Sequence, residues 1–277
     1  MHAKKPIEEA EAARLAEVKS LIAENYRGDP DFMTSLARGL IVLQAFRPEF
    51  HSLTVPQISD FTGLHRAVVR RCLYTLKALG FIYSPDNRHY HLLPRVLTLG
   101  HAYLTSSDLA RNAQTAVEHL SSFLGESCSV ATLDGDNILY IARASVKRIM
   151  KIDLLRGSRL PAHATSMGLI LLSELSEKEL SEYLNRTVLT PFTEYTIIDR
   201  ETLIHTLQKI KAQGYAINDQ QLELGLRSMA VPMYSHKGKV VAAMNVGVNA
   251  ALISAEELQK NYLPRLQRAA MELALLL

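Results

Sequence analysis

The side chains best suited to bind a partner form an arginine-rich set on one side of a helical segment: Arg66, Arg70, Arg71, Tyr74 and Lys77. A guanidinium can donate two parallel hydrogen bonds to a guanine edge or to a phosphate. Residues 33–106 carry eight Lys or Arg against three Asp or Glu, whereas residues 107–277 carry eighteen of each. Positive charge confined to one small module predicts nucleic-acid binding.

A second set of residues suggests a pocket for a small ligand. LPAHATSMGL predicts a helix start near Thr165 and Ser166, where free backbone N–H groups attract a carboxylate or phosphate. In KVVAAMNVGV, Asn245 and Gly247 share one strand face, opposite Met244 and Val246. A polar residue and a missing side chain on one face fit a pocket wall, and a bulge at Gly247 explains the pattern equally well.

Catalytic and metal-binding patterns are absent from the sequence. It contains no G-x-S-x-G, no glycine-rich phosphate loop and no H-E-x-x-H. Asp134 and Asp136 fit a hairpin turn, Cys128 a buried strand position, and His163 a cap or a core hydrogen bond. Cys72 and Cys128 make no disulfide framework or zinc knuckle. We therefore expect no enzyme, no metal and no cofactor.

The basic module reads as a winged helix-turn-helix over residues 33–94. The apolar residues of SLARGLIVLQAF have helical spacing, which predicts a first helix. Thr54 is a good N-cap for a short second helix with Pro56 in its first turn. HRAVVRRCLYTLKAL predicts a third helix that ends at Gly80. FIYSPDNRHYHLL then predicts two short strands around a turn. Arg88 and His89 on this hairpin are placed to touch the DNA backbone or minor groove.

Residues 95–126 predict one or two helices that join this module to the rest, with the linker placed at 95–110. Their apolar stripe suits packing on a second copy of the chain: Leu97, Gly100, Leu104, Leu109, Ala113, Ala116 and Leu120. A two-fold protein matches a two-fold operator. We therefore expect a homodimer or a tetramer.

The remaining module, residues 111–277, mixes strands and helices without regular alternation. Asp134-Gly135 predicts one hairpin, residues 236–238 another, and IMKIDLL a further strand. Helices are predicted within 162–175, 176–184 and 200–214 and at the C-terminal end. This order predicts an α+β fold with a mainly antiparallel sheet.

Composition narrows the class of protein. The chain is 48% hydrophobic with a net charge of +3, which excludes wholesale disorder. No apolar run is long enough to cross a bilayer, and the first residues do not resemble a secretory signal. A cytoplasmic protein without a membrane partner is expected. Residues 1–32, with an amphipathic pattern over 7–25, form a separate N-terminal extension.

Residues 33–277 resemble the IclR family of bacterial transcriptional regulators. The resemblance rests on SLARGLIVL, on TVPQISDFTGLHRAVVRRCLYTLKALGF, on LPAHATSMGLILLS and on ELGLRSMAVP. Within that family, RVLTLGHAYLTSSDL and LTPFTEYTIID are similar to regulators of the β-ketoadipate pathway, which respond to protocatechuate or 4-hydroxybenzoate. The family implies a winged helix, a dimerising linker helix and a GAF-like effector domain.

The residues predicted to bind DNA are Arg38, His65, Arg66, Arg70, Arg71, Tyr74, Arg88 and His89. For the effector pocket, the resemblance implies Ile149, Ile152, Ser166, Met167, Asn218, Leu226, Ser228, Asn245 and Gly247. Thr165, which flanks the predicted helix start, is added to this set. The family often has a smaller residue at the position of Met167, a serine at that of Asn245, and a proline or helix cap at that of His65.

These observations predict a regulator that binds double-stranded operator DNA, senses a small aromatic carboxylate and contacts RNA polymerase. Two rival hypotheses are an enzyme tethered to a DNA-binding domain, with His163 and Ser166 as candidates, and a ligand-free DNA-binding or interaction protein. Turnover of aromatic acids would reveal the first. A ligand-dependent melting temperature separates a sensor from the second.

Overall fold

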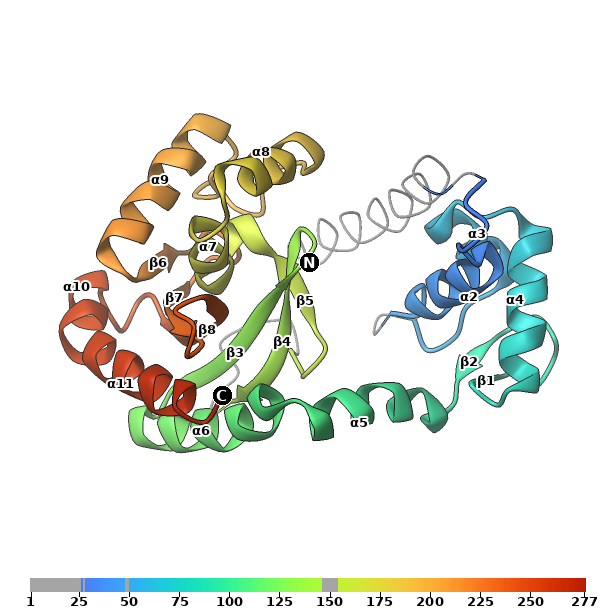
Figure 1. The fold of residues 1–277 in the computed structure, drawn as a ribbon, viewed down its shortest axis with the longest axis horizontal. Helices are drawn as coiled ribbons and strands as arrows, with labels where there is room; N and C mark the ends of the chain where they lie inside the picture. The colour runs from blue at the N-terminus through green and yellow to red at the C-terminus, as the bar shows by residue number, and fades with distance from the viewer. Residues whose placement is uncertain (1–25, 27, 48–49, 146–153) are drawn as a thin grey trace. The chain divides into compact units, whose positions relative to one another are not determined.

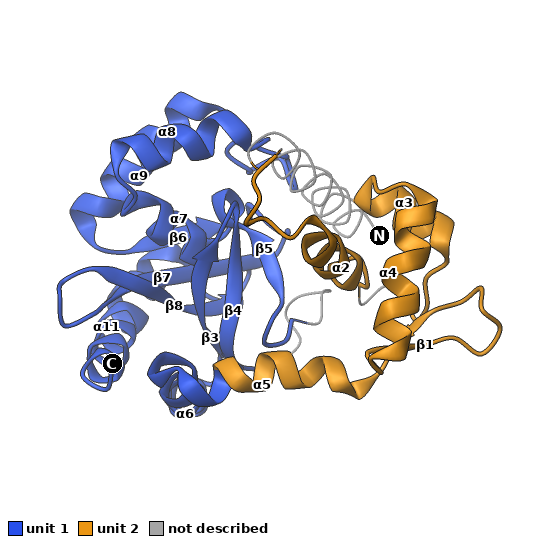
Figure 2. Ribbon diagram, turned by 45° about the vertical axis from the view of Figure 1, so that its right-hand side comes forward, with its two compact units in different colours: residues 1–7, 104–277 blue, residues 8–103 orange. Residues whose placement is uncertain are grey.

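The computed structural model describes residues 26, 28–47, 50–145 and 154–277. The amphipathic pattern over 7–25 lies outside these residues, and so does most of the strand expected from IMKIDLL. The described chain divides into two compact units, one running to Tyr103 and the other from Leu104 to Leu277 (Figure 2). Within the described residues no helix is both long and apolar enough to span a bilayer.

The N-terminal unit is a three-helix module with a small hairpin. It comprises α2 (Thr34–Gln44), α3 (Val55–Thr62), α4 (Arg66–Ala78), β1 (Ile82–Tyr83) and β2 (His91–Leu92). The predicted cap at Thr54 is confirmed: its hydroxyl accepts from the Gln57 N–H while the Gln57 side chain accepts from the Thr54 N–H. Gly63, at φ 62°, then reverses the chain between α3 and α4.

One apolar core holds this unit together. It is formed by side chains from all three helices and the hairpin, among them Ile41, Ile58, Val69, Leu73 and Ile82. The winged helix-turn-helix predicted from the sequence is therefore present, with strands of two residues each.

Two helices follow the hairpin, after the short turn η1 (Pro94–Val96): α5 (Leu97–Ser106) and α6 (Asp108–Leu124). The Ser107 hydroxyl caps α6 by accepting from the Ala110 N–H. The apolar stripe that was predicted to pack on a second copy of the chain differs in exposure between the two helices. Leu97 is 75% exposed on α5, whereas Ala113 and Leu120 on α6 are buried in this chain's own core. The α6 half of the stripe therefore does not face a twin, because it covers the sheet.

The C-terminal unit is built on a six-stranded sheet of order β5-β4-β3-β8-β7-β6, and every neighbouring pair is antiparallel. Its strands are β3 (Ser127–Asp134), β4 (Asn137–Ala144), β5 (Arg159–Pro161), β6 (Ala216–Asp219), β7 (Leu226–Tyr234) and β8 (Val240–Asn249). The hairpin turns predicted at Gly135 and Gly238 are confirmed, both at positive φ. The two short edge strands, β5 and β6, were not predicted.

Helices cover both faces of this sheet (Figure 1). One core lies under α7 (Ser166–Ser173), α8 (Glu177–Arg186) and α9 (Arg200–Gln213). The other lies under α6 and α11 (Leu263–Ala274). Short turns complete the unit: η2 (Ala162–Ala164), α10 (Ala255–Glu257) and η3 (Leu258–Tyr262). The predicted α+β class with an antiparallel sheet is confirmed.

Candidate functional site

Helix α4 displays a basic face opposite the core. Val69, Leu73 and Leu76 are buried, and the side chains predicted to read DNA are all exposed: Arg66, Arg70, Arg71 and Tyr74. The Tyr74 ring is 79% exposed. Arg38, on α2, is exposed as well.

His65 stands immediately before α4. Its Nδ1 accepts a hydrogen bond from the Ala67 N–H at 3.3 Å, so the ring caps the helix. The helix therefore begins at Arg66 even though the cap is a histidine.

A rigid turn forms the tip of the hairpin. One carboxylate oxygen of Asp86 accepts from the N–H groups of Arg88 and His89, and the other lies 2.6 Å from His89 Nδ1. These hydrogen bonds, led by that of the His89 side chain, hold the pKa of Asp86 well below its usual range. The His89 ring is thus part of the turn, and the side chains of both Arg88 and His89 are exposed.

A groove runs between α4, the start of α3 and the hairpin. Its lining includes Arg70, Tyr74, Lys77 and Arg88. Lys77 Nζ donates to Asn87 Oδ1 at 3.0 Å, which ties α4 to the hairpin tip. Cations from two elements therefore line one groove, an arrangement suited to a phosphate backbone.

The second site begins at helix α7. Thr165 is extended (φ −129°, ψ 145°) and its hydroxyl accepts from the Gly168 N–H at 3.1 Å. At a helix start the N–H groups of Ser166 and Met167 have no acceptor within the helix. Gly168 lets the helix pack closely, because a Cβ there would lie 2.1 Å from the Ala162 carbonyl oxygen.

The sheet face that α7 covers is apolar in one part and polar toward one end. Ala131, Ala230 and Ala243 lie in the core, whereas the next positions on the same face are polar or glycine. Strand pairing aligns Ser129 with Asn245, Ser127 with Gly247, and Gly247 with Ser228, which in turn pairs with Asn218. The Ser228 hydroxyl donates to Ser166 Oγ at 2.9 Å, which joins this face to α7.

These residues line one pocket. Of the residues predicted for an effector, it brings together Thr165, Ser166, Asn218, Leu226, Ser228, Asn245 and Gly247. Met167 does not line it, because its side chain points into the core and is 1% exposed. Ile149 and Ile152 lie outside the described residues. The lining also includes residues that we did not predict: Ser127, Tyr140, Arg143, Leu160, Ala164 and Leu222.

Unpartnered polar atoms converge on this pocket. Arg143 Nε, Asn218 Nδ2 and Asn245 Oδ1 are buried, and none has a hydrogen-bond partner among the described residues. A buried polar atom without a partner costs about 1–3 kcal/mol. Donors and an acceptor left this way around one pocket fit a polar ligand better than a plain core.

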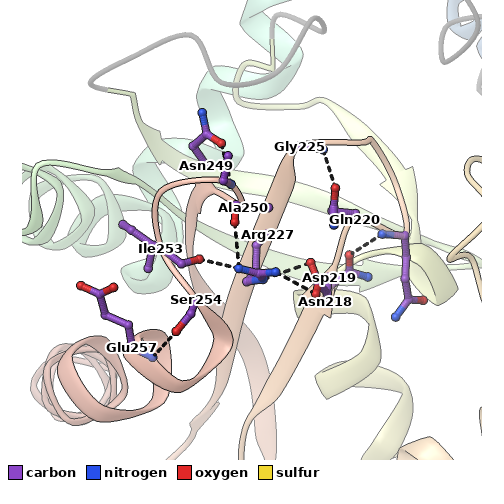
Figure 3. A network of polar contacts seen from close by, with 12 residues as sticks. Asn218, Asp219, Gln220, Gly225, Arg227, Asn249, Ala250, Ile253, Ser254 and Glu257 are labelled. Atoms are coloured by element: carbon purple, nitrogen blue, oxygen red, sulfur yellow. Dashed lines mark hydrogen bonds and ion pairs between the residues drawn. The ribbon is translucent and has the colours of Figure 1, made fainter.

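A network around Arg227 holds one wall of the pocket in place (Figure 3). Its guanidinium pairs with the Asp219 carboxylate and donates to the carbonyl oxygens of Ala250 and Ile253. It thereby fixes the turn between β6 and β7, which carries the lining residue Leu222.

Helix α6 contacts the opposite wall. Gln114 accepts from the Arg143 N–H at 3.2 Å and donates to the Arg143 carbonyl at 3.1 Å. The peptide groups of a pocket residue are thus bonded to the helix that follows the linker.

The residues considered for catalysis have structural partners. Asp136 pairs with Arg186, and Asp134 pairs with Arg159. Burial raises the pKa of Cys128 to about 12, so its thiolate is not accessible. His163 Nε2 lies 3.1 Å from the Thr190 carbonyl, and no hydrogen bond among the described residues joins it to Ser166. The described residues also contain no group of three His, Cys, Asp or Glu that could hold a metal ion.

Two family models match the chain. The IclR helix-turn-helix domain matches residues 35–86, and the C-terminal domain of the bacterial transcriptional regulator IclR matches residues 101–275. The Pca regulon regulatory protein of Pseudomonas putida is 51% identical over 90% of this chain and 85% of its own length. The p-hydroxybenzoate hydroxylase transcriptional activator of Acinetobacter baylyi is 34% identical over 88% and 91%.

Solved structures are similar too. A transcriptional regulator from Rhodococcus sp. RHA1 has a TM-score of 0.75 and 41% identity over 89% of this chain and 98% of its own. A double mutant of the inducer-binding domain of PobR from Acinetobacter, in complex with 3-hydroxybenzoic acid, has a TM-score of 0.56 and 30% identity over 61% and 98%.

Proposed function

Because the chain belongs to the IclR family of bacterial transcriptional regulators, we propose that it controls aromatic-acid catabolism in response to a small aromatic carboxylate. Protocatechuate and 4-hydroxybenzoate are the effectors we expect. The observation that carries this proposal is the pocket, in which a helix start, apolar side chains and unpartnered polar atoms meet. The names of the relatives, a Pca regulator and a p-hydroxybenzoate activator, support the same class of ligand.

We place the carboxylate on the N–H groups of Ser166 and Met167, where the helix start favours an anion. The aromatic ring lies against Leu226, with Leu160 and Leu222 as further apolar surface and Ile149 and Ile152 as the wall residues expected from the family. Ring hydroxyls then meet Asn218, Ser228 or Asn245. Thr165 remains the cap of the helix.

Calorimetry on Ser166→Pro tests this placement. Proline removes the N–H, and the extended backbone of Thr165 is the conformation that a residue before proline prefers. Ser166→Ala is the matched control, because it removes only the hydroxyl. We expect the proline variant to bind benzoate and 4-hydroxybenzoate more weakly than the alanine variant does. Equal affinities of two folded variants would move the carboxylate elsewhere.

For DNA, we propose that α4 enters the major groove and that the hairpin contacts the backbone. Arg38, Arg66, Arg70, Arg71, Tyr74 and Arg88 are the contacting side chains, with His65 and His89 positioning the elements that carry them. Arg70→Ala should weaken operator binding by ~1–3 kcal/mol if Arg70 reads a base. Arg268→Ala, on the solvent-facing side of α11, removes the same charge elsewhere and should leave operator affinity unchanged. A gel-shift titration compares the two variants.

We further propose a homodimer or tetramer in the bacterial cytoplasm that contacts RNA polymerase and has no catalytic activity of its own. The exposed apolar residues Leu97 and Leu99 on α5 support association. Sedimentation of the full chain as a monomer at micromolar concentration would contradict it.

A further inference from the structure

Arg143 is the one charged side chain among the described residues that line the pocket. It projects from β4, and its Nη1 donates to the Ser129 hydroxyl on β3 at 3.0 Å. Its Nε is buried and has no partner among the described residues. The guanidinium is therefore held in place through Nη1, while its Nε–H remains available to a ligand.

An irregularity in β4 brings this side chain to the pocket. Val130 pairs with Ala142, but the next residue of β3, Ala131, pairs with Tyr140, so Ile141 is an extra residue in β4. Side chains three positions apart lie on opposite faces of a regular strand. The bulge lets Tyr140 and Arg143 both line the pocket.

Arg143 lies away from the start of α7. Its partner Ser129 is on β3, whereas Ser166 is bonded to Ser228 on β7, two strands further along the sheet. Strands are ~4.8 Å apart and the two points are also offset by two residues along β8, so these anchor points are separated by roughly 12 Å. A six-membered ring with a polar group at each end can bridge them.

Asn245 completes this second end of the pocket. Ser129 pairs with Arg143 on one side and with Asn245 on the other, so the three residues form one row across β4, β3 and β8. Among the residues that the structure describes, Asn245 Oδ1 is a buried acceptor without a partner and Arg143 Nε–H is a buried donor without one. A hydroxyl accepts one hydrogen bond and donates another, whereas an ionised carboxylate only accepts.

We propose that Arg143 and Asn245 together form a receptor for a ring hydroxyl at the end of the effector opposite its carboxylate. This inference rests on the proposed function and deepens it. Arg143 Nε–H donates to the hydroxyl oxygen, and the hydroxyl hydrogen is donated to Asn245 Oδ1. Arg143 is thus a specificity-determining residue that separates hydroxybenzoates from benzoate and from a ring dicarboxylate such as terephthalate.

The experiment is calorimetry with 4-hydroxybenzoate, benzoate and terephthalate on the full chain. The wild type should bind 4-hydroxybenzoate most tightly. Arg143→Met retains an unbranched side chain but removes the donor, and should reduce the preference for 4-hydroxybenzoate over benzoate by roughly tenfold or more. The control Arg156→Met removes an exposed arginine that also bonds Gln114 but does not line the pocket, and should leave that ratio unchanged.

Two further variants keep the test decisive. Arg143→Lys retains the charge without the fork, so it should lower the ratio even if Arg143→Met does not fold. If the two residues hold one hydroxyl, Asn245→Ala combined with Arg143→Lys should cost less than the sum of the single changes. An unchanged ratio in folded Arg143 variants overturns this assignment alone. Failure of the wild type to bind any of the three acids instead overturns the proposed function.

Discussion

Replacing Gly168 by alanine should lower the stability of the C-terminal unit more than replacing Gly247 by alanine does. The new Cβ would lie 2.1, 2.4 and 2.6 Å from the oxygen, Cα and carbonyl carbon of Ala162. Favourable contacts between carbon atoms begin near ~3.5 Å, so α7 and η2 must separate by about 1 Å. The position of a Cβ is set by the backbone, and no rotamer change relieves the overlap.

The cost can be bounded from that geometry. Overpacking in a core costs about 1–3 kcal/mol and occasionally more. All three atoms belong to the backbone, and the helix they touch is buried along its whole length, so we expect about 3 kcal/mol or more. Gly247→Ala is the matched control in the same unit, because its Cβ would meet only Leu226 Cδ1, at 3.7 Å.

Urea unfolding of the full chain, followed by circular dichroism, measures the effect. Gly168→Ala should lower the urea midpoint clearly, and Gly247→Ala should leave it close to that of the wild type. The alanine at 168 should also abolish binding of 4-hydroxybenzoate, because the displaced helix start carries the carboxylate site. A midpoint and an affinity both unchanged in Gly168→Ala would refute the close packing of α7 on η2.

Three further predictions concern the surroundings of the pocket. Gln114→Leu should leave effector affinity unchanged but reduce the effector-induced change in operator affinity. The control Asn112→Leu, on the same helix but bonded to the Leu276 carbonyl, should leave that change as it is in the wild type. Fluorescence anisotropy with and without 4-hydroxybenzoate compares the two variants. Arg227→Met should lower the free energy of unfolding by roughly 2 kcal/mol, because the part-buried carbonyl oxygens of Ala250 and Ile253 lose their donor; denaturant titration measures this. Burial lowers the pKa of His163 below its ordinary 6.5, so the unfolded chain binds a proton more readily and the stability present above pH 6.5 is lost as the pH falls below it. In His163→Phe this loss should be smaller in denaturant titrations across that range.

Features that depend on neighbouring residues could be predicted from the sequence. The cap at Thr54 needs only Gln57 three residues on, and Asp134-Gly135 specifies its own turn. The helix start at Thr165 is equally local. These signals were sufficient for the order of elements, the winged helix and one end of the pocket.

At the second end of the pocket, Asn245 was predicted from its strand face, but Arg143 could not be predicted in this way. Arg143 reaches it through the pairing of β3 with both β4 and β8, and β3 and β8 are more than a hundred residues apart in the chain. The bulge at Ile141 also breaks the alternation from which a strand's faces are assigned. Met167 shows the converse: it neighbours Ser166, yet the helical turn directs its side chain into the core.

The missing side chain at Gly247 affects folding stability and ligand binding in opposite directions. An added methyl group fits there without strain and would fill space between the sheet and Leu226, and alanine also loses less conformational entropy than glycine on folding. The same methyl group would occupy room that the ring of a ligand needs. Gly247 therefore leaves room in the pocket at a small cost in folding stability, and a ligand that fills this room stabilises the folded chain.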